Sequence, residues 1–146
     1  MKAPILIFGW GNPSRGDDAL GPLFVERIEA LKHPEVECLT DFQLQVEHAL
    51  DLQGRQRVLF VDASLDAPAP FSITPIFPGK DASFTSHAMT PQAILHTYVQ
   101  LEDRPPPPCW LLAIRGESFE LGEPLAPAAE QHLAAALQWT ESWLNT

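Results

Sequence analysis

The residues of this chain with the clearest chemical potential are Asp18, Asp62 and His87, which lie far apart in the sequence. Two carboxylates and one imidazole suit a borderline divalent cation such as Ni²⁺ or Zn²⁺, and three protein ligands leave coordination positions open for a substrate or water. We therefore expect a metal-binding site if folding brings these three side chains together. The alternative is that they never meet in space.

Each of the three residues follows a segment that predicts a β-strand. Residues 3–8 form an apolar run that leads into the turn 9–18, and residues 57–62 form a second run that ends on Asp62. His87 falls in the loop after a presumed fourth strand, just before Thr90. In a parallel α/β sheet the active crevice lies beyond the carboxyl ends of the strands, so this pattern directs all three side chains toward one edge.

Each candidate also has an ordinary structural explanation. An aspartate at a helix N-terminus commonly caps the helix. This role accounts for one of Asp17 and Asp18 and leaves the other without a structural explanation. Asp62 ends an apolar run, where a carboxylate has to be paired, coordinated or solvated in a cleft. A loop histidine such as His87 is often a plain surface residue. The other histidines are predicted to lie on solvated faces without partners: His33, His48, His96 and His132.

Strands and helices alternate along the chain. The later predicted strands are residues 35–40, 57–62, 71–77 and 109–114, and Pro75 favours an edge or a bulge for 71–77. The first predicted helix starts near Asp17 to Leu20 and runs to Leu31, and the others cover about 45–53, 91–101 and 127–144. This order predicts a three-layer α/β/α sandwich with a mostly parallel, roughly five-stranded sheet, and residues 1–146 as a single domain.

Composition narrows the possible partners. The formal charge of −10 would repel phosphate, which argues against nucleic acid. No run approaches the roughly 18 apolar residues that span a bilayer, and the first residues resemble a strand more than a signal peptide. The two cysteines, Cys38 and Cys109, form neither a zinc framework nor a disulfide scaffold. We expect both to be small buried side chains, and the protein to be cytoplasmic.

The turn Gly9-Trp10-Gly11 looks like the start of a dinucleotide-binding fingerprint. However, Ser14 occupies the third glycine position, and Asp17 and Asp18 would oppose a pyrophosphate at the following helix. A noncatalytic nucleotide-binding domain is therefore an alternative that the charges disfavour. We expect the glycines to form a tight turn that brings backbone close to a ligand or a partner.

Four separated segments together resemble the hydrogenase maturation proteases. The family pattern G-x-G-N-x-x-x-x-D-[DE]-x-x-G appears from Gly9 to Gly21, and the strand-ending aspartate appears as Asp62. The family's Thr/Ser-His before a helix appears at residues 85–87, and residues 113–127 look like its I-x-G-x-x-F-x-x-G-x-x-L-S-P. The resemblance covers essentially the whole chain, in order.

This resemblance implies an endopeptidase that removes a C-terminal extension from the large-subunit precursor of a [NiFe] hydrogenase after nickel insertion. The family's metal-binding residues correspond to Asp18, Asp62 and His87, and the nickel is carried by the substrate, with other divalent metals able to bind in vitro. An aspartate is then the expected general base of a metal-dependent, aspartic-type cleavage, for which Asp18 and its neighbour Asp17 are the candidates. We expect a cytoplasmic monomer that binds neither nucleic acid nor membrane.

One segment departs from the commoner family pattern, and one other enzyme class stays open. Many members carry G-T-x-G-x-x-L after the second strand, whereas residues 41–47 read DFQLQVE and look like the form found with cytoplasmic, NAD-linked hydrogenases. Gln43, Gln45 and Glu47 either shape the substrate groove or begin a helix with exposed polar side chains. The other class is a peptidyl-tRNA hydrolase-like esterase, suggested by the turn from Gly9 to Pro13, which would require a nearby histidine and a basic RNA groove.

Overall fold

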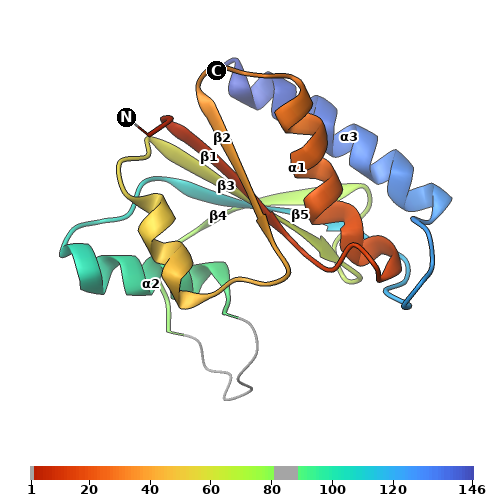
Figure 1. Ribbon diagram of the computed structural model, residues 1–146, viewed down its shortest axis with the longest axis horizontal. Coiled ribbons are helices and arrows are strands. Elements are labelled where there is room, and N and C mark those ends of the chain that lie inside the picture. The colour runs from red at the N-terminus through yellow and green to blue at the C-terminus, as the bar shows by residue number, and fades with distance from the viewer. Residues whose placement is uncertain (1, 81–88) are drawn as a thin grey trace.

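The computed structural model describes residues 2–80 and 89–146 and shows one twisted sheet between two layers of helices (Figure 1). The strands are β1 Ile5–Trp10, β2 Val36–Asp41, β3 Arg57–Ser64, β4 Phe71–Ile76 and β5 Cys109–Arg115. The helices are α1 Leu20–Ala30, α2 Pro91–Glu102 and α3 Pro127–Leu144, together with the 3₁₀ helices η1 Gly16–Ala19 and η2 Val46–Leu52. The predicted fold class is confirmed.

The strand order in the sheet is β2-β1-β3-β5-β4. The first four strands of that order are parallel, and β4 pairs antiparallel with β5. The carboxyl ends of β1 and β3 therefore lie at the same edge of the sheet. Pro75 lies in β4, which forms an edge of the sheet, as its missing N–H predicts.

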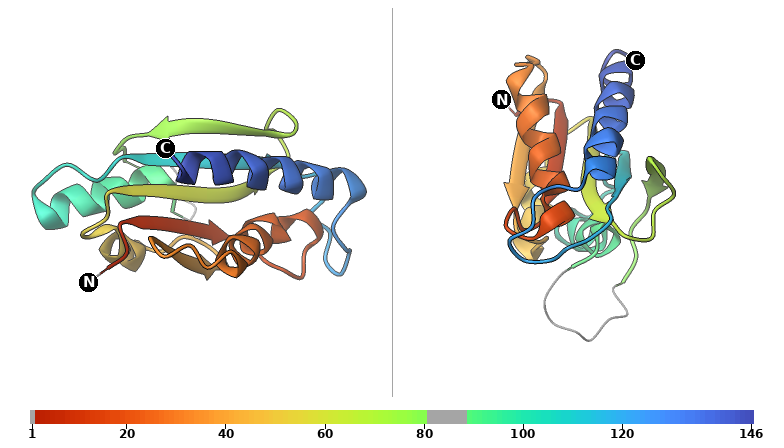
Figure 2. Two further views of the ribbon diagram at one scale, coloured as in Figure 1. Left: turned by 90° about the horizontal axis from the view of Figure 1, so that it is seen from above. Right: turned by 90° about the vertical axis from the view of Figure 1, so that its right-hand side faces the viewer.

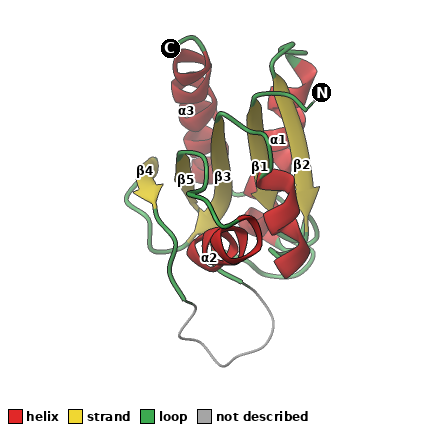
Figure 3. Ribbon diagram, turned by 90° about the vertical axis from the view of Figure 1, so that its left-hand side faces the viewer, coloured by secondary structure: helices red, strands yellow, loops and turns green. Residues whose placement is uncertain are grey.

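Alternating side chains of the parallel strands supply two separate cores. In β1, Ile5 and Ile7 join a core with α1 and α3, whereas Leu6 and Phe8 join a core with η2 and α2. Figures 2 and 3 show α1 and α3 on one face of the sheet and α2 on the other. A strand that is covered on both faces reads as a continuous apolar run, which explains why these strands were recognisable in the sequence.

Most helix boundaries agree with the sequence signals. Thr90 caps α2 by accepting a hydrogen bond from the backbone N–H of Ala93 at 3.1 Å, and Pro91 occupies the first turn, as predicted. The helix predicted at 127–144 is α3 itself, which also begins with a proline. None of the described helices is long and apolar enough to cross a membrane.

Two local predictions need correction. The helix expected at about 45–53 is the 3₁₀ helix η2, whereas α1 begins at Leu20, within the predicted range of Asp17 to Leu20, directly after the 3₁₀ turn η1. Gly16 enters η1 with a φ of +53°, a left-handed conformation that an α-helix does not continue. Strand β3 runs two residues beyond Asp62, to Ser64, because it keeps pairing with β5 after its pairing with β1 has ended.

Candidate functional site

A backbone N–H group in the turn after β1 fixes the position of the Asp18 side chain. Asp18 lies on η1, and its Oδ2 accepts a hydrogen bond from the backbone N–H of Asn12 at 2.8 Å. The Asn12 side chain in turn accepts the backbone N–H of Ser14 at 2.9 Å. This Asx turn gives Asn12 a defined conformation, so the Asp18 carboxylate has a defined position beside the end of β1.

Gly11 is required because the turn passes very close to Asp18. Its φ is +147°, and a Cβ at this position would lie 2.0 Å from the backbone oxygen of Asp18 and 3.1 Å from its Oδ1. We expected the glycines of this motif to bring backbone close to a ligand or a partner. In the structure, the lack of a side chain at Gly11 instead lets the following turn, which carries the candidate ligand Asp18, pack closely against it.

Asp62 is the first residue of β3 beyond the stretch that pairs with β1. The last β1–β3 pair is Gly9 with Val61, whereas Asp62 still pairs with Ala113 of β5. Because side chains alternate along a strand, Asp62 shares the sheet face of Phe60, which belongs to the core under α2 and η2. The Asp62 carboxylate is therefore at the rim of an apolar core, at the carboxyl edge of the sheet.

The two carboxylates are close enough to interact electrostatically. Burial and, to a smaller extent, the charge of Asp18 raise the pKa of Asp62, and a hydrogen bond from the backbone N–H of Ala63 lowers it; together they bring this pKa to about 7. Among residues 2–80 and 89–146, the close contacts between an acidic and a basic side chain are His48–Asp41 and Arg55–Glu37, and neither Asp18 nor Asp62 takes part in them. The structure thus brings Asp18 and Asp62 together without a described cation between them.

His87, the third predicted ligand, lies outside the described residues, as do Thr85 and Ser86. Within the part of the chain that is described, no group of three or more His, Cys, Asp or Glu residues is arranged to hold a metal ion. Asp18 and Asp62 are thus two members of the predicted ligand set, and the set as a whole stays a prediction.

The side chain of Asp17 lies against the segment between β5 and α3. Only 1% of its surface is exposed, and its Oδ2 accepts hydrogen bonds from the backbone N–H groups of Glu117 and Ser118 at 2.6 and 3.3 Å. Its Oδ1 accepts the N–H of Ala126 at 2.8 Å. Three backbone donors thus surround the carboxylate that we considered as a general base.

The pair of Asp41 and His48 was missed by sequence reasoning. His48 was predicted to have no partner, but its Nε2 lies 3.2 Å from Oδ2 of Asp41, at the end of β2. Its Nδ1 accepts the backbone N–H of Gln45 at 2.8 Å, as in a capping box around the start of η2. Because Nδ1 accepts, the proton is on Nε2 and is donated to Asp41. The spacing of Gln45 and His48 by three residues was the available signal.

The cysteines lie in strands, as predicted, and neither is suited to act as a nucleophile. Burial, followed by the charges of Glu29 and Glu37, raises the pKa of Cys38 to about 11. Burial raises the pKa of Cys109 to about 12. A thiol must lose its proton to attack a carbonyl, so these raised pKa values make both side chains weak nucleophiles at neutral pH.

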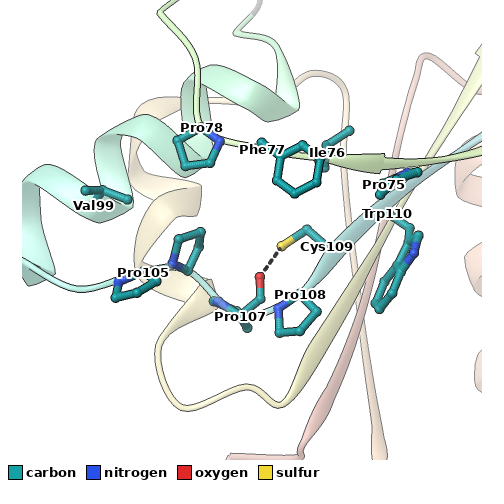
Figure 4. Close-up of a pocket in the computed structure, with 11 residues that line it drawn as sticks. Pro75, Ile76, Phe77, Pro78, Val99, Pro105, Pro107, Pro108, Cys109 and Trp110 are labelled. Atoms are coloured by element: carbon teal, nitrogen blue, oxygen red, sulfur yellow. Dashed lines mark hydrogen bonds between the residues drawn. The ribbon is translucent and has the colours of Figure 1, made fainter.

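An apolar groove of about 560 Å³ lies away from the carboxylates, at the amino end of β5 (Figure 4). It is walled by prolines 105–108 on one side and by the end of β4 on the other, where Phe77 is 71% exposed. The thiol of Cys109 donates to the carbonyl oxygen of Pro107 at 3.1 Å across its floor. Apart from this thiol and the Trp110 indole, the described residues that line the groove have only apolar side chains.

The site and the sheet together define an α/β protein with paired carboxylates at the carboxyl ends of parallel strands. The chain has the same fold as the solved hydrogenase maturation proteases. It matches the [NiFe] hydrogenase maturation protease HycI from Thermococcus kodakarensis KOD1 with a TM-score of 0.76 and 22% identity, over 99% of this chain and 94% of that one. It matches the hydrogenase maturating endopeptidase HybD from E. coli with a TM-score of 0.74 and 24% identity, over 99% and 93%. No protein-family model and no curated protein matches the sequence.

Proposed function

We propose that this chain is an endopeptidase that removes the C-terminal extension of a [NiFe] hydrogenase large-subunit precursor once nickel has been inserted. The observation that carries the proposal is the juxtaposition of Asp18 and Asp62, from two distant segments, on a fold that solved hydrogenase maturation proteases share. In this proposal the enzyme acts in the cytoplasm as a monomer.

The chemistry of the two carboxylates supports a divalent cation as the recognised group. A buried carboxylate such as Asp62, whose ionisation is opposed by the neighbouring Asp18, is stabilised in its charged form when a cation binds between the two. Adding the imidazole of His87 gives a mixed oxygen and nitrogen donor set, which suits Ni²⁺ or Zn²⁺ better than Mg²⁺ or Ca²⁺. The nickel belongs to the substrate, so a precursor without nickel would lack the group that these side chains recognise.

The cleavage itself is the addition of water to one peptide bond, which releases the C-terminal extension with a new amino group. We assign the general-base role to a carboxylate at the crevice, Asp18 or Asp62, since either can accept the proton of water. The nickel of the substrate would orient the precursor so that the scissile bond lies beside them. Asp17 is a poor choice for this role because its oxygens already accept three backbone N–H groups.

The experiment that tests this function is cleavage of nickel-loaded and nickel-free precursor, followed by mass spectrometry of the released peptide. We expect the wild type to cut only the nickel-loaded form, and Asp18→Asn, Asp62→Asn and His87→Ala to cut neither. Asp66→Asn, which changes an exposed carboxylate just after β3, and His96→Ala on α2 are the matched controls. Equal cutting of both precursor forms would remove nickel recognition from the proposal. Failure to cut any precursor, together with retention of labelled tRNA, would favour the esterase.

A further inference from the structure

Residues 116–126, between β5 and α3, pack against the turn that carries Asp18. Figure 1 shows this blue segment beside the start of α1, and the right-hand view of Figure 2 shows the same neighbourhood. The N–H of Gly122 donates to the carbonyl oxygen of Ser14 at 2.7 Å, and Nε of Arg15 donates to the carbonyl oxygen of Phe119 at 3.2 Å. Two segments about 100 residues apart thus form one unit.

Asp17 is at the centre of this contact. Its own N–H donates to the carbonyl oxygen of Ser118 at 2.8 Å, while its carboxylate accepts the N–H groups of Glu117, Ser118 and Ala126. The fit is close on both sides, because a Cβ on Gly116 would lie 3.1 Å from Cβ of Asp17, and one on Gly16 would lie 2.6 Å from the Ser118 carbonyl oxygen. A buried carboxylate with three charge-assisted bonds is a strong local constraint.

The segment that Asp17 binds is also tied to the strand that carries Asp62. The N–H of Gly116 donates to the carbonyl oxygen of Ser64 at 3.0 Å, which continues the β3–β5 pairing beyond Asp62. Asp17 therefore links η1, where Asp18 lies, to the end of β3, where Asp62 lies.

We propose that Asp17 is a positioning residue, whose hydrogen bonds to residues 116–126 hold Asp18 against Asp62. The inference names the residue that organises the site of the proposed function, and it rests on that function only for its binding readout. The role differs from general-base catalysis, because Asp17 acts through Asp18 and does not touch the substrate.

The first test reports the position of Asp18 and does not depend on function. The N–H of Asn12 is bonded to the Asp18 carboxylate, so its hydrogen exchange reports whether that carboxylate stays in place. Asp17→Asn keeps the shape of the side chain but turns an NH₂ group toward backbone donors. We expect Asn12 to lose about tenfold or more of its protection in Asp17→Asn, beyond any change in global stability.

The matched control is Arg55→Met, at the other end of the sheet. Among the described residues, Asp17 and Arg55 are the buried charged side chains, and Arg55 also bonds to backbone, at the carbonyl oxygens of Asp51 and Ala3. We expect Arg55→Met to lower global stability while the exchange of Asn12 follows global unfolding alone. If Asp17→Asn does not fold, Glu117→Pro removes one donor to the same carboxylate from the other side and should expose Asn12 in the same way.

The second test is a double-mutant cycle on binding of the nickel-loaded precursor, measured as a dissociation constant. Positioning predicts that Asp17→Asn weakens binding about tenfold or more in the wild type but adds nothing once Asp18→Asn is present. An equal loss in both backgrounds, or unchanged Asn12 exchange in Asp17→Asn and Glu117→Pro, would overturn the proposal. If the wild type does not distinguish nickel-loaded from nickel-free precursor, the proposed function fails, and the Asn12 exchange still decides the role of Asp17.

Discussion

The Asp18 carboxylate accepts the backbone N–H of Asn12 at 2.8 Å, so a backbone group of the turn after β1 fixes the place of one candidate ligand. The other described candidate, Asp62, is positioned by strand pairing, since β3 continues beside β5 after its pairing with β1 has ended. Two different backbone devices therefore bring two carboxylates to the same edge of the sheet. Each device can be disturbed separately, which makes the site accessible to simple mutations.

Gly11→Ala should disrupt the turn under Asp18. A Cβ at residue 11 would lie 2.0 Å from the Asp18 backbone oxygen, so the turn has to move. We expect a loss of about 2–4 kcal/mol in the free energy of unfolding, measured by urea denaturation, and loss of precursor cleavage by the protein that remains folded.

Gly54→Ala is the control for backbone strain alone. Gly54 also has a positive φ, +75°, but a Cβ there would meet nothing within 4 Å. We expect it to cost only about 1–2 kcal/mol and to leave cleavage intact. If Gly11→Ala and Gly54→Ala behave alike, crowding against Asp18 does not explain why residue 11 is a glycine.

Asp62 should make stability fall as pH rises. Its pKa is raised from 3.8 to about 7, so the folded chain binds this proton more tightly than the unfolded chain does. The stabilisation is complete below pH 3.8 and is lost progressively until the pH passes about 7, with a total of at most about 4 kcal/mol. Asp62→Asn stays neutral and should not show this loss.

The measurement is the free energy of unfolding of both proteins in urea at several pH values between 4 and 8, on the scale of about 1.4 kcal/mol for each pKa unit. The advantage of Asp62→Asn over the wild type should grow with pH across this range. Asp66→Asn should run parallel to the wild type, since Asp66 is exposed. Parallel curves for Asp62→Asn would mean that Asp62 is solvated in the folded chain.

His48→Ala should destabilise the chain through η2 and β2. The substitution removes the acceptor for the N–H of Gln45 and the partner of Asp41. We expect a loss of about 1–2 kcal/mol in the free energy of unfolding, which is the usual cost of removing a helix cap. ¹⁵N NMR of the wild-type imidazole should show the proton on Nε2. His96→Ala is the control for the loss of stability. In the NMR measurement, a His48 imidazole protonated on Nδ1 would contradict the assigned hydrogen bonds.

The strands and the later helices were predictable because their signals are local. Continuous apolar runs marked β1, β3 and β5, and a threonine followed by proline marked the start of α2. The resemblance to the hydrogenase maturation proteases also rested on motif residues that are visible in the sequence. The glycines of these motifs were interpreted in general terms, because a close approach such as that of Gly11 to Asp18 depends on how a strand end meets the next turn.

The contacts of Asp17 could not be predicted from sequence, and those of His48 left only the three-residue spacing from Gln45 as a signal. Asp17 was considered beside Asp18 because the two are adjacent, yet its partners lie about 100 residues away, in a segment with no regular secondary structure. His48 was assigned to an exposed face of an α-helix, and the 3₁₀ geometry of η2 turned it toward Asp41 instead. Polar contacts between distant segments, such as those of Asp17, have no periodic signal in a single sequence.

Alkylation of the cysteines should leave cleavage intact. With pKa values of about 11 and about 12, Cys38 and Cys109 hold almost no thiolate at pH 7, so iodoacetamide should modify them far more slowly than it modifies glutathione. Mass spectrometry measures the modification, and the precursor assay measures activity. A cysteine-free protein carrying Cys38→Ser and Cys109→Ala should also cut the precursor. Loss of cleavage in proportion to alkylation would instead indicate a thiol nucleophile.

Binding of the nickel-loaded precursor should weaken as pH falls from 8 to 6. A cation and a proton compete for Asp62, whose pKa of about 7 lies within this range. For a single competing proton, the dissociation constant should rise by at most about tenfold for each pH unit below 7 and should level off above it. The Asp18 charge contributes to that raised pKa, so Asp18→Gln, besides weakening binding, should move the midpoint to lower pH. Nickel-free precursor is the control, because its weaker binding does not involve this competition. A midpoint that stays the same in Asp18→Gln would mean that the two carboxylates act independently.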